Sequence, residues 1–278
     1  MKRIAAITMV RNDNFYLRKW VEYYGVQLGK DNLFIYFDGL DQDIPSFCEL
    51  THAEKIDKIG KDVVSNDKGR VAVMSTCAAA LFADGYDMVI GTDCDEIIIP
   101  DPSTGCSLSE FLDKYEGKAV ISPLGLDVGQ KIGEEEPIDE SVPFLRQRHY
   151  AQIGTRYSKA SILCAPLTWG SGFHRVKGHD IHIAKDLYLF HFGYFDMGRI
   201  QERFKDKSRL EQGWERHLRK RSRTCRLVTE LPSRDFDKWT GIARRLQAVC
   251  RPPYAWNKPG MLGLKIVVRI PERFQDLV

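Results

Sequence analysis

An acidic cluster follows an apolar run in the middle of the chain. Asp93, Asp95 and Glu96 come directly after Met88–Thr92, whose composition indicates a buried strand. Buried strands of open α/β sheets bind ligands at their carboxyl ends, and neighbouring carboxylates repel unless a cation lies between them. Mg²⁺ and Mn²⁺ prefer carboxylate oxygens and can bridge the phosphates of a nucleotide. The cluster therefore predicts a divalent metal site that includes Asp93 and Asp95, with a solvated acidic turn as the alternative.

A histidine could complete this site. His191 lies in the apolar run Leu189–Phe192, which resembles the end of a buried strand. A neutral imidazole there can be a third metal ligand, and the alternative is a core histidine whose ring nitrogens are hydrogen-bonded.

The glycine motifs that bind phosphate are absent from the sequence. There is no GxGxxG after the first expected strand and no GxxxxGK[ST] anywhere. The dehydrogenase and P-loop classes therefore have no support, and a phosphate bound at the acidic cluster would need a metal.

The first hundred residues alternate between strand and helix patterns. Strands are expected at Lys2–Val10, Leu33–Phe37, Ile56–Ile59 and Tyr86–Gly91, and helices after Asn12, at Ser46–Ala53 and at Gly69–Ala83. This alternation predicts an α/β fold, with a mixed, mostly parallel sheet and helices on both faces.

The remaining chain has a different pattern. A helix is expected at Leu108–Tyr115, and strands at Ala119–Ser122, Arg148–Leu163, His179–Phe190 and Leu262–Ile270. Leu126–Pro143 is rich in Gly, Glu and Pro, so we expect an active-site loop there. Polar helices should follow from Arg199 onward.

Composition excludes the collagen-like, disordered and disulfide-scaffold classes of protein. The chain has 278 residues, of which 43% are hydrophobic and 28% charged, as in ordinary globular proteins. Its seven cysteines form no CxxC pair, so we expect free thiols and a reducing, cytoplasmic location. No run of about 18 apolar residues predicts a membrane span.

Charge is unevenly distributed along the chain. Arg199–Lys258 holds 17 Lys and Arg against 7 Asp and Glu, a net charge of +10, whereas the rest of the chain carries −7. The segment, densest between Arg216 and Arg226, could contact an anionic membrane surface or a phosphate-bearing acceptor, or be a solvated helical face. Few aromatic residues lie near it, so nucleic acid is not an expected partner.

Several short motifs in order resemble a known family. They are Met9–Asp13 with Tyr16-Leu17 and Trp20–Tyr24, then Phe34–Asp38, Asp93–Glu96, His174 and Phe190–Gly193. Together they resemble a bacterial glycosyltransferase family 2-like group over Ile4–Tyr194, with Asp93–Glu96 at the position of its DxD metal motif. The sequence departs from that pattern at Asp13, Tyr24 and Ile97.

The resemblance implies a GT-A fold that binds a nucleotide-diphospho-sugar, with Mn²⁺ or Mg²⁺ at the DxD motif. It implies metal ligation by Asp93, Asp95 and His191. The donor would be bound by Met9, Val10, Arg11, Asp38, Thr92, Asp93, Trp169 and His174. In this set Trp169 would stack on a sugar face, with a packing role as the alternative, and His174 would contact diphosphate or acceptor.

Sugar transfer with inversion needs a general base for the acceptor hydroxyl. Asp127, expected just past a strand, is the first candidate. The second is one of the three glutamates on the following loop, Glu134, Glu135 and Glu136, of which we choose Glu135. These assignments rest on position alone.

The sequence thus predicts a glycosyltransferase that acts on a glycan, lipid-linked or other cell-surface acceptor. Residues 1–195 would form the catalytic domain and residues 196–278 a basic, mainly helical extension in peripheral contact with the inner face of the membrane. A haloacid-dehalogenase-like phosphatase also uses DxD, but the expected Thr or Val does not follow at Ile97. A sugar-nucleotide-forming nucleotidyltransferase would need a glycine-rich loop after the first strand, and a non-catalytic polyanion-binding protein is the remaining alternative.

Overall fold

Four parallel strands form one half of a ten-stranded sheet. The computed structural model describes residues 1–60, 63–205 and 223–278. The strand order in this half is β3 (His52–Ile56), β2 (Leu33–Asp38), β1 (Ile4–Val10) and β4 (Met88–Gly91). Every residue of β1 is buried, as expected for a central parallel strand covered on both faces.

The other half of the sheet is mainly antiparallel. It contains β5 (Glu96–Pro100), β6 (Val120–Val128), β7 (Tyr150–Ile153), β8 (Ile162–Leu163), β9 (Ile183–His191) and β10 (Ile266–Arg269). The short β8 joins β4 to β6, and β6 continues through β7 to β10, all in antiparallel pairs. β9 runs parallel to β6 and antiparallel to β5. The α/β class with a mixed sheet is confirmed.

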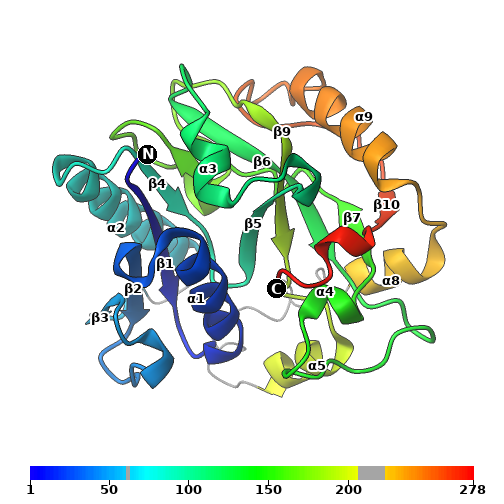
Figure 1. Ribbon diagram of the computed structural model, residues 1–278, viewed down its shortest axis with the longest axis horizontal. Coiled ribbons are helices and arrows are strands. Elements are labelled where there is room, and N and C mark those ends of the chain that lie inside the picture. Colours follow the sequence, from blue (N-terminus) through cyan, green and yellow to red (C-terminus); the bar gives the residue numbers. More distant parts are fainter. Residues whose placement is uncertain (61–62, 206–222) are drawn as a thin grey trace.

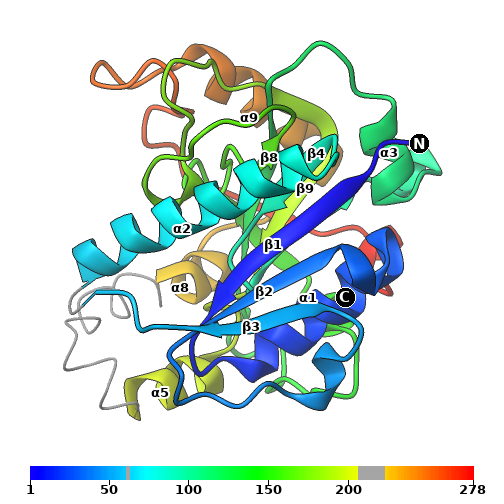
Figure 2. The same cartoon turned by 90° about the vertical axis from the view of Figure 1, so that its left-hand side faces the viewer.

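Two long helices cover opposite faces of the parallel half. They are α1 (Asn14–Leu28) and α2 (Val63–Ala83), seen on either side of β1 in Figure 2. Successive side chains of a strand point to opposite faces, and β1 divides accordingly. Ala6 packs with the α1 residues Trp20 and Tyr24, whereas Ile7 packs with Met74 of α2.

Shorter helices surround the sheet (Figure 1). They are α3 (Leu108–Asp113), α4 (Phe144–Gln147), α5 (Met197–Lys205), α8 (Arg223–Glu230) and α9 (Phe236–Val249). Single 3-10 turns occupy Lys30–Asn32, Ser46–Cys48, Pro102–Thr104, Ser171–Phe173 and Glu272–Phe274. No helix among these residues is long and apolar enough to cross a membrane.

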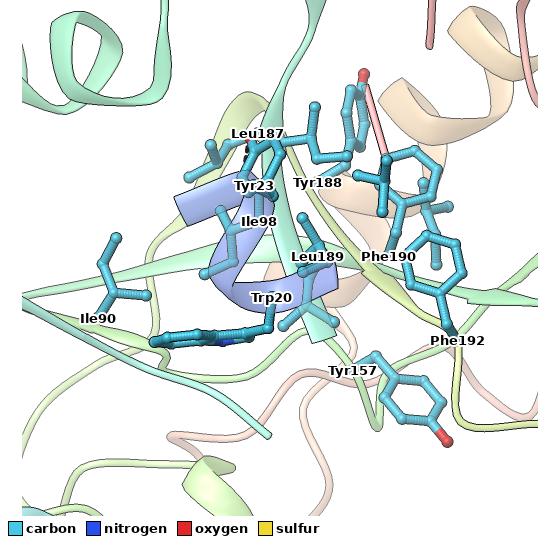
Figure 3. Close-up of a cluster of buried hydrophobic side chains, with 14 of the residues drawn as sticks. Trp20, Tyr23, Ile90, Ile98, Tyr157, Leu187, Tyr188, Leu189, Phe190 and Phe192 are labelled. Atoms are coloured by element: carbon cyan, nitrogen blue, oxygen red, sulfur yellow. Dashed lines mark hydrogen bonds between the residues drawn. The ribbon is translucent and has the colours of Figure 1, made fainter. Parts of the chain in front are cut away.

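A large aromatic and aliphatic core joins α1 to the second half of the sheet. Figure 3 shows Trp20 and Tyr23 of α1 beside Ile98 of β5 and the β9 side chains Leu187 and Leu189. Hydrogen bonds anchor this helix: the Tyr23 hydroxyl donates to the Ile98 carbonyl, and the Ile98 amide donates to the Tyr24 hydroxyl, both at 2.9 Å. The position of β5 is therefore fixed directly against α1.

Several expected local elements differ from the structure. The strand expected over Arg148–Leu163 is two short strands, β7 and β8. The helix expected at Ser46–Ala53 ends after one turn at Cys48, because His52–Ile56 pairs with β2 in a parallel ladder. The loop expected from Leu126 begins only after Val128, since β6 stays buried to that residue and pairs with both β7 and β9.

The C-terminal residues belong to the same sheet and core. β10 is hydrogen-bonded to β7, and the buried Phe274 contacts the rings of Tyr188 and Phe190 of β9. The division expected at residue 195 therefore coincides with no break in packing among the described residues. Residues 206–222, which include most of the densest basic run, lie outside them.

Candidate active site

Asp95, Glu96 and His191 meet where β4 and β5 join and β9 ends. β4 ends at Gly91, the chain turns through Thr92–Asp95, and β5 begins at Glu96. Glu96 is opposite His191 in the antiparallel β5–β9 pair. One ligand atom from each of these three residues lies within 4.8 Å of the others, and His191 Nε2 is 3.8 Å from Asp95 Oδ2.

Two further features fit a cation at this cluster. Glu96 is buried, and its Oε2 has no hydrogen-bond partner among the described residues. Gly193 leaves space beside the other two groups, because a Cβ there would lie 2.3 Å from Asp95 Oδ2 and 2.7 Å from His191 Nε2. Two carboxylates and one imidazole suit Mn²⁺ or Mg²⁺, so these residues fit the metal that the sequence predicts.

Asp93 faces two cations instead. Its Oδ1 pairs with Arg70 of α2, and its Oδ2 accepts a hydrogen bond from Lys159 Nζ at 3.0 Å. Burial opposes ionisation, but the charges of Arg70 and Lys159 hold the pKa of Asp93 well below its usual range. The two aspartates thus have different surroundings: Asp95 lies with Glu96 and His191, whereas Asp93 lies in an ion-pair network.

Lys159 connects this network to the cluster. Its buried Nζ also lies 2.6 Å from Glu96 Oε1, so one ammonium bridges two carboxylates. Burial raises the pKa of Glu96, and the ammonium offsets part of that effect. Sequence reasoning missed both Arg70 and Lys159, because neither lies in a motif and only the fold brings them to Asp93.

The carboxylate of Asp127, the first candidate for the general base, is hydrogen-bonded to His191. Asp127 Oδ1 accepts from His191 Nδ1 at 2.7 Å, and the Thr224 hydroxyl donates to Oδ2. The ring of Tyr157 stacks on the imidazole with centroids 4.0 Å apart. A carboxylate is an acceptor only, so His191 donates from Nδ1, and its Nε2 faces Asp95. Thr224 and Tyr157 are contacts that no sequence motif marked.

The residues expected to bind the nucleotide lie at the ends of β1 and β2. Met9 and Val10 are buried at the end of β1. Arg11 donates to the Asp38 carbonyl at 2.5 Å and pairs with Asp41 at 2.9 Å, while Asp38 Oδ1 accepts from the Ile59 amide at 2.7 Å.

Thr92 and Trp169 are buried beside the acidic cluster. The Thr92 hydroxyl accepts from Trp20 Nε1 at 2.9 Å. Trp169 donates its indole N–H to the Ala160 carbonyl at 2.7 Å and packs against Gly91 and Phe173. In this structure Trp169 therefore occupies a packing position in the core, the alternative that the sequence left open.

His174 and Glu135 have neighbours outside the cluster. His174 is half-buried, with its ring beside Gly172. The Glu135 carboxylate accepts from the Lys131 amide at 2.7 Å and from the amide and Nδ1 of His149 at 2.7 and 3.0 Å. Those bonds close the loop after β6, so the geometry gives Glu135 a structural contact.

Comparisons with known proteins gave structural matches only. No family model and no curated protein matches the sequence. A protein described as a nucleotide-diphospho-sugar transferase from Desulfovibrio desulfuricans G20 is 19% identical, with a TM-score of 0.25, over 46% of this chain and 59% of that one. Mannose-1-phosphate geranyltransferase from Thermus thermophilus is 8% identical, with a TM-score of 0.30, over 96% and 74%.

A third match is the glycosyltransferase GlyE of Streptococcus pneumoniae TIGR4. It is 16% identical, with a TM-score of 0.21, and the match covers 50% of this chain and 32% of that one. This chain thus spans less than two thirds of the length of the first and third structures. Its function is argued from the geometry of its own site.

Proposed function

We propose that this chain is a metal-dependent glycosyltransferase. It would move a sugar from a nucleotide-diphospho-sugar to a hydroxyl of a glycan, a lipid-linked sugar or another cell-surface acceptor. One observation carries the proposal: Asp95, Glu96 and His191 converge at the end of a parallel strand, with one buried carboxylate oxygen that has no partner in the described part of the chain. Ligands of open α/β sheets bind at such strand ends.

Asp95, Glu96 and His191 would hold Mn²⁺ or Mg²⁺. When bound, the ion supplies positive charge that neutralises the donor's diphosphate, which is part of the leaving group. Arg70 and Lys159 place two further cations beside this position. In this assignment Asp93 keeps those two cations in place, and Glu96 takes the ligand role that was predicted for Asp93.

The nucleotide would lie across the ends of β1 and β2. Met9 and Val10 end the central strand, and Arg11 and Asp38 are held together there by a hydrogen bond. A side-chain oxygen of Asp38 could accept from ribose or base, as the resemblance implies. Thr92 precedes Asp93 in the chain, His174 would contact diphosphate or acceptor as the resemblance implies, and Trp169 supports the strand end by packing.

We assign Asp127 to positioning His191 rather than to proton acceptance. Both of its oxygens already accept hydrogen bonds, one from an imidazole and one from a hydroxyl. The two loop glutamates beside Glu135 are exposed. Glu134 pairs with Lys131 at 2.7 Å, and Glu136 contributes its carbonyl to Arg148. Glu136 is therefore the loop carboxylate most open to an acceptor hydroxyl.

Titration calorimetry of Asp95→Asn with Mn²⁺, alone and with a nucleoside diphosphate, tests the proposal. We expect the Mn²⁺ affinity to fall by more than the roughly 10–100-fold typical of a residue that only orients a ligand. Glu116→Gln is the control, because Glu116 is exposed beyond α3, whose end contacts Lys2 at the opposite end of β1. Unchanged Mn²⁺ affinity in Asp95→Asn would contradict the metal site.

A further inference from the structure

Exposed apolar side chains gather at the end of α9 and on the loop that follows it. Five large apolar residues between positions 249 and 265 are 49–83% exposed: Val249, Tyr254, Trp256, Leu262 and Leu264. They are five of the eleven exposed large apolar residues in the described part of the chain. We call residues 249–265 the apolar loop. Scattered apolar residues on a surface are ordinary, but a concentration within one short segment indicates a contact surface.

The backbone of the apolar loop is well anchored. Arg251 donates to the Trp256 carbonyl at 3.0 Å, and the Gly260 amide donates to the Gln247 carbonyl at 3.3 Å. Met261 points inward, where it is buried and its sulfur accepts from Gln247. The exposed side chains therefore project from a closed, hydrogen-bonded turn.

Leu262 has an unusual backbone conformation. Its φ is +49°, a region in which bulky L-residues are strained, and its side chain is 83% exposed. Neither local conformation nor burial favours a leucine here in the isolated chain. Leu50 shares this conformation and exposure, so the argument for a partner rests on the grouping of apolar side chains in the loop and not on Leu262 alone.

The charge of the apolar loop indicates what that partner is. Residues 249–265 include Arg251, Lys258 and Lys265 and no acidic residue. Tyr and Trp are enriched at membrane–water interfaces, and basic residues add attraction to anionic lipids. We propose that the apolar loop inserts its side chains into the interfacial layer of a bilayer that contains anionic lipids.

The segment that contains Trp169 and Val176 connects the proposed docking surface to the candidate active site. Asn257 of the apolar loop donates to the Val176 carbonyl at 3.0 Å, and Val176 pairs with Trp169 in an isolated β-bridge. Trp169 packs on Gly91, directly before the acidic cluster. Figure 2 shows the loop beyond α9 (orange) extending away from the sheet. A bilayer bound there would lie near that edge of the site.

Vesicle binding without metal or donor tests this inference separately from sugar transfer. The full chain is sedimented with vesicles of phosphatidylcholine alone, or of equal parts phosphatidylcholine and phosphatidylglycerol, at low and high salt. We expect binding to the anionic vesicles that weakens in high salt but persists through the apolar contact. Trp256 emission should shift to the blue on binding, and Trp256→Phe should lose that shift.

The double variant Trp256→Ala/Leu262→Asn should bind the anionic vesicles at least about tenfold more weakly than the unmodified chain, since two apolar side chains lose their burial. Leu50→Asn is the matched control, because Leu50 is 82% exposed with a φ of +69° and lies outside the loop. Equal binding by the double variant and the unmodified chain would overturn the inference. So would self-association that the double variant abolishes, without vesicle binding, because it would identify a second copy as the partner.

Discussion

Lys159 connects two acidic residues of the candidate site. Its ammonium contacts both Asp93 and Glu96, and its side chain is almost fully buried. The cluster holds three acidic side chains, Asp93, Asp95 and Glu96, against the two cations of Arg70 and Lys159. A divalent cation at Asp95, Glu96 and His191 would remove that excess, in agreement with the Glu96 oxygen that no described residue contacts by a hydrogen bond.

Asp127 is predicted to act on metal binding through His191. Asp127→Asn keeps the shape and a carbonyl acceptor but removes the charge that supports the imidazole, so the Mn²⁺ affinity should fall about 10–100-fold. Calorimetry gives the affinity, and ¹⁵N spectra of the metal-free protein report whether the His191 proton stays on Nδ1. Thermal unfolding should change little.

Thr224→Val separates this role from simple packing. It removes the hydroxyl that donates to Asp127 but leaves the bond from Asp127 to His191 intact. The variant should keep most of the Mn²⁺ affinity. If Asp127→Asn and Thr224→Val weaken Mn²⁺ binding equally, or if neither changes it, Asp127 does not position the ligand.

At the scale of elements, the site depends on pairings between distant strands. The sequence was sufficient to predict β1, β2 and β4, because short apolar runs between helical patterns mark buried parallel strands. It also placed the acidic cluster at a strand end. The β5–β9 ladder, which sets Glu96 opposite His191, joins segments far apart in the chain, and local patterns do not encode such pairings. For the same reason the contacts of Lys159 and Asp127 could not be predicted.

Gly193 is where the turn after β9 approaches the candidate ligands. Gly193→Ala would place a methyl group 2.3 Å from Asp95 Oδ2 and 2.7 Å from His191 Nε2, so one of these groups must move. We expect Mn²⁺ affinity to fall at least about tenfold, because ligand geometry is lost. Calorimetry with Mn²⁺ and thermal unfolding measure the two effects.

Gly241→Ala in α9 is the matched control for Gly193. A Cβ at that position meets nothing within 4 Å, and alanine favours a helix by roughly 0.5–1 kcal/mol. This variant should therefore unfold at a slightly higher temperature with unchanged Mn²⁺ binding. Full Mn²⁺ affinity in Gly193→Ala would show that no cation lies between Asp95 and His191.

For the molecule as a whole, the C-terminal residues complete the core and the site. Thr224 of α8 contacts Asp127, the buried Arg148 pairs with Asp196 at 2.6 Å, and β10 extends the sheet beyond β7. A charge asymmetry along the sequence suggested a separable basic extension. Charge reports the solvated surface, however, whereas the packing depends on buried apolar residues, and these continue to Val278. We therefore propose that residues 1–195 depend on the C-terminal residues for folding.

Phe274→Ala tests that dependence. The side chain of Phe274 is fully buried, and its ring lies 5.4 Å from Phe190 and 5.4 Å from Phe236, centroid to centroid. Removing a buried phenylalanine ring should lower the free energy of unfolding by about 3–5 kcal/mol, measured by urea denaturation. Tyr254→Ala, which truncates an exposed ring, should change it by less than about 0.5 kcal/mol.

A fragment of residues 1–195 should correspondingly lack a cooperative unfolding transition, because it has lost β10 and the rings that cover β9. If that fragment unfolds cooperatively and Phe274→Ala is as stable as the unmodified chain, residues 1–195 form an independent domain after all.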